Sequence, residues 1–111
     1  MDAQEKLELI VDRLLVKTQD KHCNWTKNQD GKYGFKLAYG ILSLYNQGGT
    51  IVLDICKDDI VMSSKKKDIA DSNSNLVRLF KEVNEYYTNY VNEYLTKIIT
   101  EIQKLGEPLP F

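Results

Sequence analysis

Few residues of this chain have side chains suited to catalysis, and their spacing argues against it. The single histidine, His22, stands next to Cys23, one of two cysteines. A cysteine nucleophile needs a base within hydrogen-bond reach, and adjacent positions on a helix do not face each other. A structural zinc ion takes about four ligands, more than one histidine and two cysteines supply. The pair therefore predicts neither a nucleophile–base dyad nor a zinc site.

Other short motifs are better explained by folding than by chemistry. Asp58 and Asp59 are typical of a hairpin turn, and Gly48-Gly49 lacks the spaced glycines and following helix of a phosphate-binding loop. Asp54 alternates with apolar neighbours, which predicts an exposed side chain on the open face of a sheet. We expect no catalytic residue, no metal and no cofactor, and we expect a protein that is not an enzyme.

The charge balance argues against a nucleic-acid partner. The chain carries 15 basic and 16 acidic residues, a net charge of -1, whereas nucleic-acid binders usually carry a basic surplus. Residues 65–67 are three lysines, followed by Asp68 and Asp71, which predicts a solvated loop. Only Arg13 and Arg78 are arginine, the residue whose planar guanidinium best hydrogen-bonds to phosphate.

The expected compartment is the cytoplasm. No segment approaches the roughly 20 apolar residues of a membrane span, and the acidic start at residues 1–5 differs from a secretory signal. Cys23 and Cys56 fit a reducing compartment as free thiols.

The elements that would position these residues form one domain, residues 1–111. Apolar residues recur at three- and four-residue steps over residues 4–21, which predicts a helix capped by Asp2. Alternation and turn residues then predict strands at 33–39, 41–46, 50–57 and 60–63, with a further short strand around 25–27. Residues 65–73 read as a polar loop. A second helix is expected at 76–105, with Ser72 or Ser74 as its cap, and Gly106 ends it.

The expected fold is α+β: an N-terminal helix, an antiparallel meander of three to five strands, and a long C-terminal helix packed on one sheet face. Phe35, Leu37, Leu53 and Ile55 would share the heavy face of the sheet. Trp25 would pack under the joint between the first helix and the sheet.

The last helix is too long for this sheet. Its thirty or so residues make a rod of about 45 Å, whereas strands of six or seven residues span about 20–23 Å. The overhanging apolar stripe would be covered by a second copy of the chain, by another partner, or by the first helix together with the tail at 109–111. Four tyrosines and an isoleucine mark it: Tyr86, Tyr87, Tyr90, Tyr94 and Ile98. They indicate an interface or shallow groove, or alternatively a core stripe whose hydroxyls reach the rim.

The order of elements resembles that of a widespread class of small uncharacterised bacterial proteins. The residues that carry this outline are Leu14-Leu15 with Thr18, Trp25, Gly40-Ile41, Leu53-Asp54-Ile55, Asp71-Ser72 and Leu76-x-x-Leu79-Phe80. Such proteins are often found in mobile elements or phage-related neighbourhoods, and the resemblance implies no activity or site.

These observations predict a non-enzymatic protein-interaction module that forms a homodimer through the C-terminal helix, with Tyr86, Tyr87, Tyr90, Tyr94 and Ile98 as contact residues. Two alternatives remain open. One is a binder of a small ligand or peptide in a pocket between helices and sheet. The other is a chaperone of the secretion or toxin-partner type.

Overall fold

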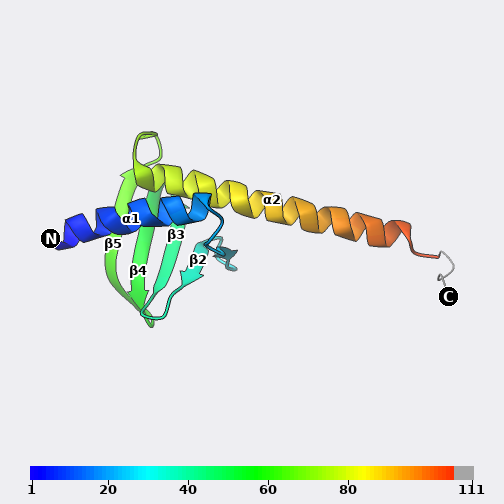
Figure 1. The fold of residues 1–111 in the computed structure, drawn as a ribbon, viewed down its shortest axis with the longest axis horizontal. Coiled ribbons are helices and arrows are strands. Elements are labelled where there is room, and N and C mark those ends of the chain that lie inside the picture. The colour runs from blue at the N-terminus through cyan, green and yellow to red at the C-terminus, as the bar shows by residue number, and fades with distance from the viewer. Residues whose placement is uncertain (107–111) are drawn as a thin grey trace.

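The computed structural model describes residues 1–106, which form two helices and a five-stranded sheet. The strands follow one another in chain order, and every neighbouring pair is antiparallel. Both helices lie on the same face of the sheet and cross its strands (Figure 1). The predicted α+β fold is therefore confirmed. The elements are α1 (Ala3–Gln19), β1 (Thr26–Lys27), β2 (Tyr33–Lys36), β3 (Ile41–Gln47), β4 (Thr50–Lys57), β5 (Ile60–Asp68) and α2 (Asn75–Gln103).

Helix α1 begins and packs as its sequence predicts. The Asp2 carboxylate accepts a hydrogen bond from the backbone N–H of Glu5 at 2.8 Å, which satisfies one of the free donors of the first turn. Five buried side chains recur at three- and four-residue steps: Leu7, Val11, Leu14, Leu15 and Thr18. Trp25 is also buried, and its indole Nε1–H donates to Thr18 Oγ1 at 3.1 Å. The indole thus joins the end of α1 to the sheet, as expected.

Strand β2 is shorter than predicted, because the chain turns after Lys36. The backbone N–H of Leu37 donates to the carbonyl of Gly40 at 2.8 Å, which closes a tight turn. A Cβ at Gly40 would lie 2.9 Å from the carbonyl oxygen of Cys56 on β4, so only glycine fits this close approach. As a result Leu37 is 47% exposed. Its assignment to the buried face was wrong, although Phe35 and Leu53 do pack in the core.

Strand β5 is longer than predicted, and the three lysines lie on it rather than in a loop. Lys65 pairs with Leu53 and Lys67 with Ile51 in the β4–β5 register. Lys65 forms an ion pair with Glu8 of α1, and Lys67 lies 3.4 Å from Asp71. Lysine stems can cover apolar sheet surface while the ammonium groups stay in water, so this edge strand carries no apolar alternation by which to recognise it.

Helix α2 has two parts with different surroundings. Ser74 caps its start, and Leu76, Val77, Leu79 and Val83 are buried against the rest of the protein. Asn75 Nδ2 donates to Asp12 Oδ1 at 2.6 Å, so the start of α2 lies beside the middle of α1. Beyond the sheet α2 continues alone, and the molecule measures 64 × 31 × 27 Å (Figure 1).

The helix ends at Gln103, two residues earlier than expected. The tail at 109–111, which we considered as a cover for the overhang, lies outside the described residues. Neither helix among residues 1–106 has the length and apolar composition needed to cross a membrane.

Candidate interaction surface on the C-terminal helix

The base of the projecting helix is fixed to the sheet by aromatic contacts. The Tyr87 ring meets the Tyr33 ring edge-on, with centroids 5.8 Å apart. The Tyr33 hydroxyl donates to Asn84 Oδ1 at 2.6 Å, and burial, followed by the proximity of Tyr87, raises the pKa of that hydroxyl. The ammonium of Lys27 lies 5.8 Å from the Tyr87 ring centroid. Of the predicted contact residues, Tyr87 is thus half-buried and belongs mainly to the packed head of the protein.

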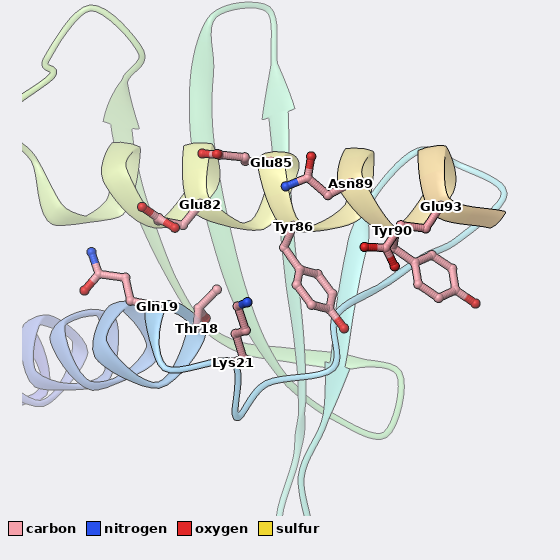
Figure 2. A pocket seen from close by; sticks show the side chains of 9 residues that line it. All are labelled: Thr18, Gln19, Lys21, Glu82, Glu85, Tyr86, Asn89, Tyr90 and Glu93. Atoms are coloured by element: carbon pink, nitrogen blue, oxygen red, sulfur yellow. The ribbon is translucent and has the colours of Figure 1, made fainter. Parts of the chain in front are cut away.

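Two grooves flank Tyr86 and Tyr90, the next tyrosines of the set. One, of about 370 Å³, lies between the end of α1 and α2, and the other, of about 390 Å³, lies beside residues 24–27. Figure 2 shows the Tyr86 ring reaching from α2 towards the chain that follows α1, near Lys21. Tyr86 is half-buried there, whereas Tyr90 is 58% exposed. Since α1 ends level with these residues, it does not cover the helix beyond them.

A regular apolar seam runs along the projecting part of α2 and ends in the turn that follows the helix. Its five residues are separated by alternating steps of four and three: Val91, Leu95, Ile98, Ile102 and Leu105. This is the spacing by which a helix presents one continuous stripe to a neighbouring helix. Leu95 is 50%, Ile102 59% and Leu105 76% exposed.

Tyr90, Tyr94 and Ile99 border this seam. Tyr94 and Ile99 are 55% and 56% exposed, and Ile98 within the seam is half-buried. Polar residues occupy the opposite side, where the Thr96 and Thr100 hydroxyls donate to the carbonyls of Asn92 and Thr96. Along residues 91–105 no other described element packs on the apolar side.

The five predicted contact residues are therefore divided by the structure. Tyr90, Tyr94 and Ile98 lie on the projecting part, whereas Tyr86 and Tyr87 lie at its base. The prediction emphasised tyrosines and omitted Leu95, Ile99, Ile102 and Leu105, which are at least half exposed. Their four-and-three spacing was the available signal, since a helix that outruns its sheet exposes the stripe it would otherwise bury.

The polar residues on the open face of the sheet form a structural network. Asp54 is half-buried rather than exposed, because it accepts hydrogen bonds from the Tyr45 hydroxyl at 2.8 Å and from the Ser64 hydroxyl. Burial, then the hydrogen bond to Asp54, raises the pKa of Tyr45. Burial, then the negative charge of Asp54, also raises the pKa of the Cys56 thiol, which makes it a weaker nucleophile at neutral pH.

The remaining chemical candidates stay apart. His22 is exposed while Cys23 is buried, and both cysteines are free thiols. Within residues 1–106, no three side chains of histidine, cysteine, aspartate or glutamate come close enough together to hold a metal ion.

Comparison of the chain with models of known protein families, with curated proteins and with solved structures finds no match.

Proposed function

We propose that this protein is an interaction module, without catalytic activity, that forms a homodimer through residues 88–105. The observation that carries the proposal is the seam of Val91, Leu95, Ile98, Ile102 and Leu105, of which Leu95, Ile102 and Leu105 are at least half exposed. Contiguous apolar surface of this kind is unusual on a monomer and marks interaction sites. A second copy is the partner that fits it, because heptad spacing on one helix matches the same spacing on another.

The shape of the protein favours an antiparallel pair. Val91 lies one helical turn after Tyr87, so the seam lies on the same side of α2 as the contacts with the sheet. A parallel partner helix would continue along that side, into the space occupied by the sheet and α1. An antiparallel partner avoids this conflict when Leu95 of one copy meets Ile98 of the other. Ile102 then lies opposite Val91, near the start of the projecting part, and both residues are within the helix.

The area available predicts a dimer of moderate strength. Six side chains of this segment are at least half exposed: Tyr90, Tyr94, Leu95, Ile99, Ile102 and Leu105. Together they offer about 400–500 Å² of apolar surface per copy, against about 800 Å² of total surface per partner in a standard interface. Polar residues beside the seam add to this area. We therefore expect dissociation in the micromolar range and a concentration-dependent mass.

Sedimentation equilibrium between about 1 and about 300 µM tests the proposal. The expected mass rises from the 12.8 kDa of one chain to twice that value. A mass that stays at one chain throughout contradicts the proposal.

The orientation has its own test, an electron–electron distance between spin labels on Arg78→Cys, in a background with both native cysteines replaced by alanine. Arg78 is exposed on the head and lies about 18 residues from the expected twofold axis. An antiparallel dimer separates the two labels by about 55 Å along the helices. A parallel dimer brings them within about 20 Å, which would refute the antiparallel arrangement and leave dimerisation standing.

We also infer a cytoplasmic location, which the two free thiols favour. The likeness to small bacterial proteins of mobile elements stays a prediction.

A further inference from the structure

A third groove lies far from the projecting helix, between α1 and the end of the sheet where β2 turns into β3. It is open to solvent and has a volume of about 350 Å³. Its floor is made of Leu14 from α1, Leu42 from β3 and Ile55 from β4, with Ile10 beside them. All four are branched aliphatic residues, so the floor is apolar and offers no hydrogen-bonding group from its side chains.

The turn between β2 and β3 forms the lip of this groove. Leu37 is 47% and Tyr39 97% exposed, although both side chains line the groove. The turn cannot move away easily, because Gly40 packs against the Cys56 carbonyl with no room for a Cβ and its own carbonyl accepts from Leu37. Two large apolar side chains are thereby held next to an apolar floor. The surrounding chain leaves Leu37 and Tyr39 exposed, and an apolar ligand in the groove would cover them.

The other side of the groove carries positive charge. Arg13 and Lys17 are four residues apart on α1, so their side chains lie on one face of the helix. Among residues 1–106 the ion pairs are Lys65 with Glu8 and Lys67 with Asp71, so neither Arg13 nor Lys17 is neutralised by an acidic side chain. No acidic residue lines the groove. The groove thus combines an aliphatic floor with two uncompensated cations at one edge.

We infer that this groove binds a linear medium-chain carboxylate, with the carboxylate between Arg13 and Lys17 and the alkyl chain over Leu14, Leu42 and Ile55. An arginine fork matches the two oxygens of a carboxylate, and the lysine adds a second charge. At about 30 Å³ per heavy atom, the share of one water molecule in the liquid, the volume holds about a dozen atoms. Decanoate has that size. Its flexible chain suits a floor without aromatic rings, and the exposed Tyr39 can close over it.

Titration of the full chain with decanoate below its micelle concentration, followed by ¹⁵N–¹H correlation spectra, tests the inference. Saturable shifts are expected at residues 10–17, 37–42 and 55. Decylamine has the same tail and the opposite charge, so its dissociation constant should be at least about tenfold higher than that of decanoate.

Variants of exposed residues locate the site without disturbing the core. Arg13→Gln/Lys17→Gln should weaken decanoate binding by about tenfold or more. Lys81→Gln removes an exposed cation from α2, outside the groove, and should leave binding unchanged. Leu37→Ser should weaken binding of decanoate and decylamine alike.

Several results would overturn the inference. They are equal binding of decanoate and decylamine, no effect of Arg13→Gln/Lys17→Gln, or no saturable shifts at all. Tighter binding at the same residues by a peptide that ends in a leucine carboxylate would assign the groove to a protein partner instead. Shifts confined to residues 91–105 would place the alkyl chain on the α2 seam, and this outcome would refute the groove site while leaving dimerisation untouched.

Discussion

Truncation of the α2 seam is the most direct perturbation of the proposed dimer. In Leu95→Ala/Ile102→Ala the two seam side chains on either side of Ile98 become methyl groups. Both residues lie beyond the head of the protein, 50% and 59% exposed, so their loss opens no cavity in the core. Alanine is also the best helix former, and α2 should stay helical.

The expected loss follows from the exposed fractions. Burying a whole leucine or isoleucine side chain stabilises by about 1.5–3 kcal/mol, so burying the exposed half contributes about 1 kcal/mol. Each substitution occurs in both copies and therefore costs the dimer about 2 kcal/mol. The double variant loses about 4 kcal/mol, which is about a thousandfold in the dissociation constant.

Sedimentation equilibrium measures this loss, and circular dichroism checks that the helix content is retained. The double variant should remain a single chain at concentrations where the wild type is mainly dimeric. Thr96→Ala/Thr100→Ala is the matched control, since these two exposed hydroxyls bond only to the backbone of their own helix on the polar side. If the seam variant dimerises as tightly as this control, the reasoning from the seam is refuted.

Three further predictions concern the head of the protein. Thr18→Val should lower the free energy of unfolding by about 1–3 kcal/mol in urea titrations, because the buried Trp25 indole N–H loses its acceptor; Thr18→Ser should restore most of it, and an unchanged stability for Thr18→Val would contradict this role. Asp54→Asn should lower the raised pKa of Cys56, because the like charge is removed, so the thiol should react severalfold faster with iodoacetamide at pH 8; an equal or slower rate would show that Asp54 does not set its reactivity. Burial raises the pKa of Tyr33 above its ordinary value of 10.0, which stabilises the folded state at pH values below 10.0, and this contribution is lost as pH rises through the folded pKa. The wild type should therefore lose more free energy of unfolding than Tyr33→Phe between about pH 9 and about pH 12. Equal losses in the two proteins would refute the assignment.

The helices and the central strands could be predicted because their periods are local. Helix α1 was expected at 4–21 and is found at Ala3–Gln19, with the expected cap Asp2. The strand predicted at 50–57 matches β4, Thr50–Lys57. In α1 the buried residues recur at every helical turn. In β4 a run of β-branched and other apolar residues lies between two turns, which marks a strand even though Ile51, Val52 and Leu53 are all buried.

The errors fall where a side chain does two things at once. The lysines at 65–67 pair with the buried Ile51, Val52 and Leu53 of β4. A lysine stem can lie on apolar surface while its charge stays in water, so the rule that polar residues form loops fails for β5. Leu37 is apolar and in step with Phe35, but the chain leaves the sheet after Lys36 because Gly40 packs against β4. The alternation of apolar and polar residues in either strand does not indicate the close approach of the Gly40 backbone to the backbone of β4.

The interaction surface could be predicted in kind but not in position, because residue type does not tell which part of a continuous stripe is covered. Val77 and Leu95 are 18 residues apart, which is five helical turns, and so face the same side of α2, yet Val77 is 0% and Leu95 50% exposed. Only the width of the sheet separates them, and that width depends on β1 and β2 reaching Tyr87 through Lys27 and Tyr33. The tyrosines therefore lie at a boundary. The part of the stripe before the tyrosines stabilises the fold of a single chain. The part after them contributes to stability only when a second chain covers it. It follows that substitutions of stripe residues of α2 before Tyr87 should change the stability of the monomer, whereas substitutions of stripe residues after Tyr87 should change dimerisation alone.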